Sequence, residues 1–318
     1  MIAPHLLRRA RVTAAFALLT FSTLVARARN AEPRVSYEKT VQTWRADREA
    51  KLKADDGWLR VSGLFWLREG VNEFGPGPAN DIVLPAGGAT PALDRFGAFE
   101  LAGGKVTLRA AEGAAVTLND KPVREAEVRA DAGKRPDLIR VGDLSLLLLK
   151  RGERFAIRLK DPNSAARREF TGLRWYPVRD SYRVAAQFVP YEHPRDVSIL
   201  NIIGDLETYK SPGLLKFRLN GQEYTLEPVL SGDKLFIIFR DLTSNKTTYG
   251  ASRFLYADLP RDGQVTLDFN QAINPPCAFT AYATCPLPPR QNRLAVAIEA
   301  GELNYHAPHG KDTTAETR

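Results

Sequence analysis

The sequence predicts a mainly β protein in which one N-terminal helix precedes two β domains. The chain holds 21 prolines and 23 glycines spread over 318 residues, which is typical of many turns and short elements. From Trp58 onward, apolar and polar residues alternate over strand lengths, with Gly, Asp, Asn and Pro between the segments. The length itself suits two domains better than one.

Residues 36–54 form the one segment with a clear helical pattern. Ser36 can cap its first turn, and the DDG triplet at 55–57 can end it. Four residues fall on or near one helix face: Tyr37, Val41, Trp44 and Leu52. We therefore expect a helix with one face packed against the rest of the protein.

The expected strands fall into two groups. They are 105–109, 115–119, 138–149 and 154–159 in the first group, and 182–189, 197–203, 214–230, 234–241, 253–259, 264–270 and 293–300 in the second. Hairpin turns are expected at 118–123 and at 219–223. The second contains Asn-Gly, which accepts positive φ at both central positions of a two-residue turn.

A polar segment at 160–170 interrupts the strand pattern, and we place a domain boundary near it. The second β domain is expected to be a mostly antiparallel barrel or curved sheet. The expected organisation is a signal peptide at 1–28, a helical region at 29–57, a β-sandwich at 58–162, the second β domain at 163–305 and a disordered tail at 306–318.

The N-terminus has the pattern of an export signal. A basic segment precedes the apolar stretch Thr13–Ala26, and Ala26 and Ala28 provide small residues for signal peptidase. The alternative is an uncleaved anchor, although the apolar stretch is short for a bilayer and no later stretch is apolar enough for a membrane helix. We therefore expect a periplasmic or secreted protein without a transmembrane segment in the mature chain.

The charge pattern argues against nucleic-acid binding. Removing residues 1–28 takes away four arginines and no acid, so the formal net charge falls from +8 to +4 (41 basic against 37 acidic residues). The remaining basic residues are scattered, whereas nucleic-acid binders show a basic stripe with aromatic platforms.

The two cysteines, Cys277 and Cys285, suit one disulfide in an exported chain. Two free thiols and a metal site are the alternatives. Seven residues separate the cysteines, whereas zinc ligands usually stand two to four apart and need further partners. Beyond the export signal only His193, His306 and His309 could serve, so we expect no metal and no cofactor.

Common catalytic motifs are missing from the sequence. There is no G-x-S-x-G, no G-x-x-x-x-G-K-[ST] and no H-E-x-x-H. His193 is the one histidine outside the tail and the signal, and we interpret it as an exposed loop residue. Whether the protein is an enzyme stays open at this point.

Polar residues that suit a ligand site gather between Asp241 and Glu302: Asp241, Thr248, Tyr249, Arg253, Asp268, Asn270 and Asn274. Alternation places Asp268 and Asn270 on one face of a strand. One interpretation is a small-molecule pocket in which Asp268 is an acid or base and Arg253 an anion anchor. The other, which we favour, is a structural network in which these side chains hydrogen-bond the backbone of an irregular loop.

An aromatic segment at 57–70 contains Trp58, Phe65 and Trp66. These rings could form a carbohydrate platform. Because leucine and valine stand between them, we interpret the segment as core packed against the helix.

Several segments together resemble the DUF1684 family of uncharacterised bacterial proteins. They are GWLRVSGLFWLREGVNEFG, NDIVLP, FRDLTSNKTTYGASRFLY, DFNQAINPPCAFTAYATCPLPP and NRLAVAIEAGE. The family implies no reaction, so the resemblance supplies a family without a mechanism.

The first β domain also resembles a forkhead-associated (FHA) β-sandwich, through NEFGPGPANDIVLP at 72–85 and VTLNDKPV at 116–123. Two departures concern phosphate binding. Pro76 stands where FHA domains place an arginine after the glycine, and TPALDRFGAFEL contains no histidine. The resemblance implies an FHA-like sandwich without its phosphate-binding residues.

These observations lead to one functional hypothesis and two alternatives. The first is a non-catalytic protein of the cell envelope that binds a small-molecule ligand or an envelope protein. The alternatives are a small-molecule hydrolase-type enzyme with a polar pocket around Asp268 and Arg253, and a purely structural assembly protein.

Overall fold

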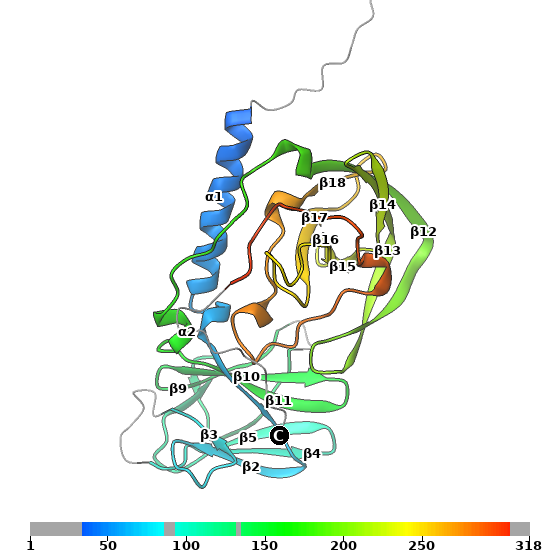
Figure 1. The fold of residues 1–318 in the computed structure, drawn as a ribbon. Coiled ribbons are helices and arrows are strands. Elements are labelled where there is room, and N and C mark those ends of the chain that lie inside the picture. Colours follow the sequence, from blue (N-terminus) through cyan, green and yellow to red (C-terminus); the bar gives the residue numbers. More distant parts are fainter. Residues whose placement is uncertain (1–33, 86–92, 132–134, 306–318) are drawn as a thin grey trace, which may run out of the picture.

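The computed structural model describes residues 34–85, 93–131 and 135–305, so the predicted signal peptide and the predicted tail lie outside the described residues. One long helix runs beside a body of β-sheets, and the mainly β fold class is confirmed (Figure 1). The first domain is a sandwich of two sheets, and the second is built from two further sheets.

The helices are α1 (Arg34–Lys53) and α2 (Ala165–Arg168). The strands of the first domain are β1 (Val61–Trp66), β2 (Gly70–Gly75), β3 (Ile82–Val83), β4 (Gly97–Ala102), β5 (Lys105–Ala110), β6 (Val116–Leu118), β7 (Lys121–Pro122), β8 (Glu125–Glu127), β9 (Leu138–Val141), β10 (Leu144–Arg151) and β11 (Arg154–Lys160). Those of the second are β12 (Arg183–Leu200), β13 (Leu206–Leu219), β14 (Gln222–Leu226), β15 (Val229–Ser231), β16 (Lys234–Phe239), β17 (Arg253–Asp258) and β18 (Gln264–Asp268).

The first domain stacks a six-stranded sheet on a five-stranded sheet. Their strand orders are β1-β11-β10-β9-β6-β7 and β3-β2-β4-β5-β8. Strand alternation turns one face of each sheet inward, and the resulting core includes Phe74, Phe99, Leu108, Leu148 and Ile157. This packing is the β-sandwich that the sequence predicts.

The outer face of the six-stranded sheet is covered by the rest of the protein. On β11, Ile157 and Leu159 point into the sandwich core, whereas Ala156 and Arg158 point outward and are nevertheless buried. Contacts with the second domain explain this burial. The hydroxyl of Thr280 donates to the carbonyl of Val61 at 3.0 Å. A cationic strand residue thus becomes an interior residue at the junction of the two domains.

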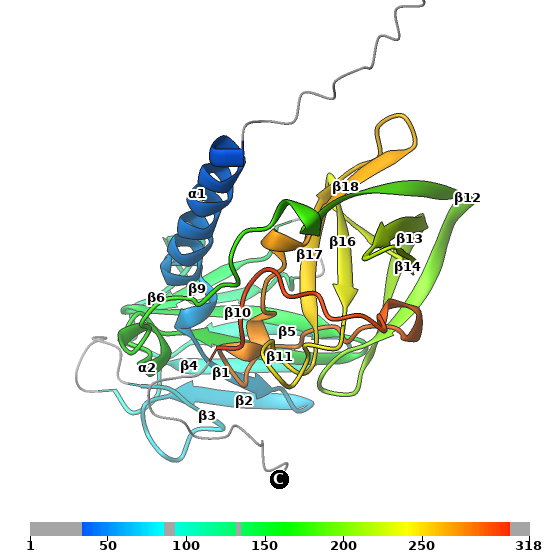
Figure 2. The same ribbon diagram turned by 45° about the horizontal axis from the view of Figure 1, so that its top comes forward.

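The second domain contains a four-stranded sheet in the order β14-β13-β12-β18 and a three-stranded sheet in the order β15-β16-β17. β17 lies beside β18 and β13 beside β15, so the two sheets curve around one hydrophobic core (Figures 1 and 2). The sheets remain open, so the curved-sheet alternative is the correct one. The predicted turn at 219–223 is present, with Asn220 and Gly221 at positive φ.

Helix α1 ties the N-terminal region to the second domain, beside which it runs in both views (Figures 1 and 2). The hydroxyl of Tyr37 donates to Asp268 at 2.8 Å. Arg45 donates to the carbonyl of Tyr176 at 3.0 Å, and Glu49 accepts from the amide of Leu173 at 2.9 Å. The helix begins at Arg34, so Ser36 lies inside its first turn and does not cap it.

The predicted strand at 293–300 is wrong. Apolar residues there are buried at every second position, as in a strand: Leu294, Val296, Ile298 and Ala300. Their backbone groups, however, bond to irregular partners. The carbonyl of Val296 accepts from the amide of Leu242, and those of Ile298 and Ala300 accept from the guanidinium of Arg253. Burial at every second position therefore does not by itself produce the hydrogen-bond pattern of a β-strand.

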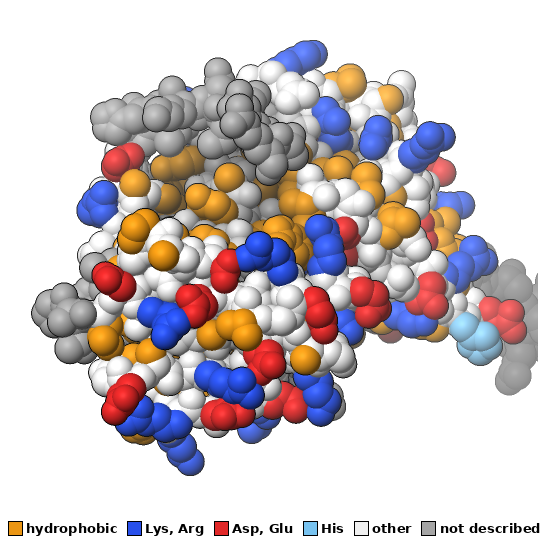
Figure 3. All heavy atoms as spheres, turned by 90° about the horizontal axis from the view of Figure 1, so that it is seen from below, with side chains coloured by type: hydrophobic (Ala, Val, Ile, Leu, Met, Phe, Trp, Pro, Cys, Tyr) orange, Lys and Arg blue, Asp and Glu red, His pale blue; other side chains and the backbone are white. Residues whose placement is uncertain are grey.

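The surface seen from the side of the first domain carries Lys and Arg interspersed with Asp and Glu, without a basic stripe (Figure 3). Several of these charges pair across strands, such as Lys105 with Glu127 at 3.1 Å. Within residues 34–85, 93–131 and 135–305, no helix has the length and apolar character needed to cross a membrane.

Candidate functional site

Three of the seven predicted site residues form a closed network inside the second domain. Arg253, at the start of β17, donates to Asp241 at 2.6 Å and to the carbonyl of Ile298 at 3.0 Å. The other carboxylate oxygen of Asp241 accepts from the amide of Thr243 at 2.7 Å. The hydroxyls of Thr243 and Thr248 lie 2.8 Å apart. These hydrogen bonds hold the loop 241–248 against the C-terminal segment.

Asp268 and Asn270 form a second network around the end of β18. Asp268 accepts from the amide of Asn270 at 3.1 Å and from Gln271 at 3.3 Å, as the N-cap of a 3₁₀ turn. Asn270 bonds both backbone groups of Arg179, and its amide also donates to Tyr37. Burial, followed by the charge of Asp268, raises the pKa of Tyr37. The structure thus brings Asp268 to helix α1 and leaves Arg253 in a separate network.

The predicted disulfide is not formed, because both Cys277 and Cys285 are free thiols. Cys285 is buried, and its sulfur accepts from the backbone amide of Cys277 at 3.1 Å. Tyr249, another predicted site residue, donates to the carbonyl of Cys277 at 3.2 Å. Hydrogen bonds and packing hold this loop in place, so it does not depend on a covalent link.

A cavity of about 510 Å³ lies at the junction of the two domains and α1. Asn274 is the one predicted site residue that lines it. The first domain contributes Trp58 and three charged residues from the segment after β8 and from β10 and β11, α1 contributes Arg48, and the second domain contributes the rest of the wall. We refer to it as the junction cavity.

The second domain supplies an aromatic wall for the junction cavity. The rings of Phe236 and Tyr256 stack at 4.8 Å with an interplanar angle of 13°, and Phe254 meets Phe236 edge-on at 4.8 Å. Tyr256 is 47% exposed, which places it at the cavity mouth. Trp58 adds a fourth ring, from the 3₁₀ turn that precedes β1. Trp58 is therefore partly a lining residue, and only partly the core residue that the sequence suggested.

An ion-pair cluster forms another part of the lining. Arg151 lies 2.9 Å from Asp131 and 3.8 Å from Glu207, and its Nε donates to Thr284 at 3.1 Å. Glu207 also accepts from the hydroxyl of Tyr209 at 2.7 Å. Burial and the neighbouring carboxylate raise the pKa of Tyr209. Both carboxylates of this cluster are thus engaged by side chains of the wall.

Arg158 is the one charged side chain of the lining that has no ion-pair partner among the described residues. Its residue is 8% exposed, and its Nε and Nη2 atoms have no hydrogen-bond partner. Its guanidinium lies over the ring of Trp58 at 4.9 Å. Burial, with a smaller contribution from the charge of Arg151, lowers the pKa of Arg158 to about 10. Among the described residues no carboxylate pairs with it.

A buried carboxylate stands behind the cavity wall. Glu302 is 1% exposed, and its nearest cation is Arg48, whose Nε lies 3.6 Å from Oε2. Arg48 also donates to the carbonyl of Asn274 at 3.1 Å. Burial raises the pKa of Glu302 to about 7, although the charge of Arg48 acts in the other direction.

Sequence reasoning missed most of the junction cavity because its lining comes from distant segments. Arg158 appears as the outward residue of an alternating strand, a pattern typical of solvent exposure. The segment 57–70 offered one signal, since its rings, Trp58 among them, could also form a ligand-binding platform.

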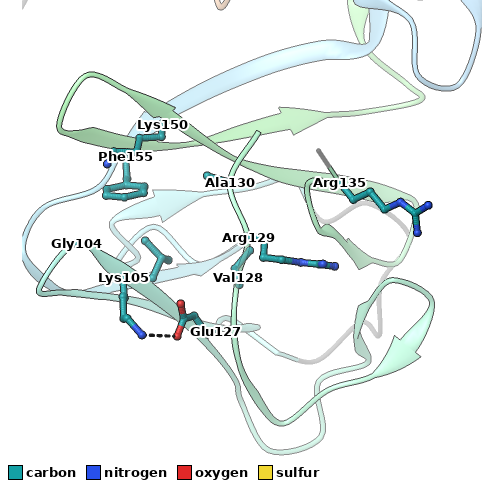
Figure 4. A pocket seen from close by; sticks show the side chains of 10 residues that line it. Gly104, Lys105, Glu127, Val128, Arg129, Ala130, Arg135, Lys150 and Phe155 are labelled. Atoms are coloured by element: carbon teal, nitrogen blue, oxygen red, sulfur yellow. Dashed lines mark hydrogen bonds and ion pairs between the residues drawn. The ribbon is translucent and has the colours of Figure 1, made fainter. Parts of the chain in front are cut away.

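A second hollow, of about 500 Å³, lies on the first domain (Figure 4). In that view Arg129 extends away from Lys105 and Phe155. Arg129 pairs with Asp137 at 2.6 Å, and Lys105 pairs with Glu127. The Arg129 and Asn119 hydrogen bonds outweigh the effect of burial and lower the pKa of Asp137 to about 2. These charged side chains pair with one another within the first domain, so the junction cavity is the stronger candidate for a ligand site.

No group of three metal-ligating side chains occurs within the described ranges. The geometry therefore defines a two-domain β protein with one partly charged, partly aromatic cavity at the domain junction.

Comparison with known proteins relates part of this chain to a family. The DUF1684 family, described as a protein of unknown function, matches residues 168–303. That match covers most of the second domain. The motif at 57–75 lies outside it. A search of the curated proteins finds no match.

Three solved structures are similar to parts of the chain. One is an uncharacterised protein of Haloarcula marismortui, with 33% identity and a TM-score of 0.37, covering 43% of this chain and 78% of that one. Another is the FhaA FHA domain, solved with the intracellular domain of Rv3910, with 22% identity and a TM-score of 0.22, covering 30% and 97%. The third is an FHA domain from work on phosphothreonine-dependent FHA interactions, with 22% identity and a TM-score of 0.22, covering 30% and 92%.

Proposed function

We propose that this protein is an exported, non-catalytic binding protein of the cell envelope that holds a small-molecule ligand in the junction cavity. The cavity itself carries the proposal. At about 510 Å³ it falls within the 300–1,000 Å³ that is typical of ligand sites. Its lining combines aromatic surface, which is typical of such sites, with five charged side chains.

The position of the cavity also supports ligand binding. Ligand sites occur preferentially between domains, where two rigid bodies can each supply part of the wall. Here the six-stranded sheet provides Arg151 and Arg158, and the second domain provides Glu207 and most of the aromatic side chains. Neither domain alone forms the cavity.

The carboxylates of the lining favour binding over catalysis. Asp131 and Glu207 hold Arg151 and Tyr209 in place, and so act as parts of the wall. Asp268 and Arg253, which a hydrolase would have to bring together, belong to separate networks. This arrangement favours the binding function over the hydrolase alternative.

Export is supported by the sequence of the first 28 residues. A basic segment, an apolar core of 14 residues and small residues at a cleavage site are the features of a signal peptide. Periplasmic fractionation of the full-length chain, followed by N-terminal sequencing, should yield a mature protein that begins within a few residues of Arg29.

The binding function is tested by thermal shift on residues 29–318 with a library of small envelope metabolites. A ligand should raise the Tm of the wild-type protein. It should not raise the Tm of Ile273→Trp, which fills the junction cavity with a larger side chain. Val71→Trp is the matched control, because Val71 is 56% exposed on the far sheet of the first domain. A library without a single stabilising compound would argue for the structural alternative.

A further inference from the structure

We propose that the ligand of the junction cavity is a flat aromatic monocarboxylate, whose carboxylate pairs with Arg158 and whose ring lies against the aromatic wall. This inference rests on the proposed binding function and specifies the chemistry of the same site. Three features of the cavity support it: the unpaired guanidinium of Arg158, the pairing of the other charges of the lining, and the shape of the aromatic wall.

Burial of the Arg158 guanidinium without an anionic partner is energetically costly. Removing a guanidinium from water is unfavourable unless an anion and hydrogen-bond acceptors replace the solvent. The ring of Trp58 offsets part of this cost through a cation–π contact. Two of its nitrogens, Nε and Nη2, still have no acceptor. A ligand anion in the cavity that Arg158 lines would supply one.

The lining also indicates how many charges that anion carries. Of its three arginines, Arg151 pairs with Asp131 and Glu207, and Arg48 lies beside Glu302 and donates to the carbonyl of Asn274. Arg158 is the one guanidinium of the lining without a paired carboxylate, so a single ligand carboxylate suffices to pair with it. Guanidinium forks match the two oxygens of a carboxylate, whereas a dianionic phosphate would leave one charge without a partner.

The shape of the aromatic wall favours a flat ligand. Phe236 and Tyr256 present nearly parallel rings, and Tyr256 lies at the open end. Aromatic surfaces favour a planar partner in an offset stack or an edge-to-face contact. The hydroxyl of Tyr209 and the charged cluster lie along the same lining and can accommodate a polar substituent. A cavity of this volume accepts more than one fused ring.

We suggest 2-naphthoate as the probe, with binding to residues 29–318 measured by isothermal titration calorimetry. Three analogues each change one property: 2-naphthamide removes the charge, decahydro-2-naphthoate removes the flat ring, and 2-naphthyl phosphate adds a charge. The inference predicts that 2-naphthoate binds more tightly than all three.

Variants of Arg158 test whether its guanidinium binds the carboxylate of the ligand. Arg158→Gln should weaken 2-naphthoate binding by roughly 30-fold or more, as expected when one member of a buried charge pair is lost. Arg158→Lys should keep part of the affinity, because it keeps the charge. Arg140→Gln is the control, since Arg140 is an exposed arginine of the same sheet that pairs with Asp120. Circular dichroism and weak 2-naphthamide binding, unchanged by Arg158→Gln, verify that this variant is folded.

The outcomes separate this inference from the proposed function. Equal affinity for 2-naphthoate and 2-naphthamide, tighter binding of the phosphate or the decahydro compound, or an unaffected Arg158→Gln variant would overturn the monocarboxylate assignment. If the naphthalene probes fail but another compound of the library binds and Ile273→Trp abolishes its binding, the inference is wrong and the binding function stands. If no compound of any class binds, both are wrong.

Discussion

Arg253 and Asp241 form an ion pair that is closed off from solvent inside the second domain. Nη1 of Arg253 lies 2.6 Å from Oδ2 of Asp241, and their side chains are 1% and 0% exposed. The same guanidinium binds the carbonyls of Ile298 and Ala300. One side chain thereby joins β17, the loop after β16 and the irregular C-terminal segment.

Replacement of Arg253 should therefore be strongly destabilising. Arg253→Met leaves the buried carboxylate of Asp241 without its cation, a change that typically costs about 3–5 kcal/mol of the free energy of unfolding. Urea denaturation followed by circular dichroism measures the loss. Lys210→Met is the control, because it breaks the exposed pair with Asp196 at 2.7 Å and should cost no more than about 1 kcal/mol. Equal stability of the two variants would contradict the structural role of Arg253.

Asp268 should affect stability and not ligand binding. Its carboxylate accepts hydrogen bonds from Tyr37, Asn270 and Gln271, and an amide in its place retains a single acceptor oxygen. Asp268→Asn should lower the free energy of unfolding by about 1–3 kcal/mol. Asp258→Asn, at a 71% exposed side chain, is the matched control and should cost less than about 1 kcal/mol.

The same pair of variants decides between two roles for Asp268. If it belongs only to the network with α1, the affinity for 2-naphthoate should be unchanged in both variants. If the affinity for 2-naphthoate falls in Asp268→Asn alone, Asp268 is instead part of the ligand site.

The sequence was informative wherever the interactions are local. The hairpin at 219–222 follows from an Asn-Gly pair, and the structural role of Asp268 and Asn270 follows from their place at the end of a strand. Tyr37, which completes that network, is 231 residues away from Asp268. No pattern within either segment could have indicated this partner.

Residues at the junction were not predictable for a related reason. Arg158 has the sequence pattern of an exposed residue, and it becomes buried only because a second domain covers its sheet. One interpretation of the sequence placed Arg253 in a pocket with Asp268, whereas in the structure Arg253 pairs with Asp241. Both carboxylates follow strands, so the choice depends on how the two open sheets pack, and alternation does not encode that.

The two cysteines should titrate as two thiols in denatured protein prepared without reductant. In the native protein Cys277 should react first. Its hydrogen bond with Cys285 lowers the pKa of the Cys277 thiol against the effect of burial, whereas the pKa of Cys285 is raised. Cys277→Ala should remove the faster phase and Cys285→Ala the slower one. A denatured protein with no reactive thiol would instead indicate the disulfide that the sequence suggested.

Gly301 should be far less tolerant of alanine than another glycine of similar conformation. Both Gly301 and Gly221 have positive φ, at 83° and 80°. A Cβ at Gly301 would lie 2.5 Å from the carbonyl oxygen of Ala272, whereas nothing lies within 4 Å at Gly221. Gly221→Ala should cost about 1–2 kcal/mol from the backbone alone. Gly301→Ala should cost clearly more in the same urea titration, and equal losses would contradict the close approach.

Glu302 should make the stability of the folded protein depend on pH. Its pKa is about 7 in the folded state against an ordinary value of 4.5, because burial disfavours the charged form. Between these two values the folded state keeps a proton that the unfolded state releases. The resulting stabilisation is complete below about pH 4.5 and is lost as the pH rises to about 7. For this shift the loss amounts to about 3 kcal/mol.

The test is the difference in the free energy of unfolding between wild type and Glu302→Gln, measured at pH 5 and pH 8. Glutamine cannot ionise, so the wild type should lose stability relative to this variant as the pH rises. Glu299→Gln, at a 53% exposed side chain, should follow the wild type across the same range. If the wild-type and Glu302→Gln curves run parallel, Arg48 holds the carboxylate of Glu302 ionised in the folded protein, and the cavity wall then contains a buried ion pair at every pH tested.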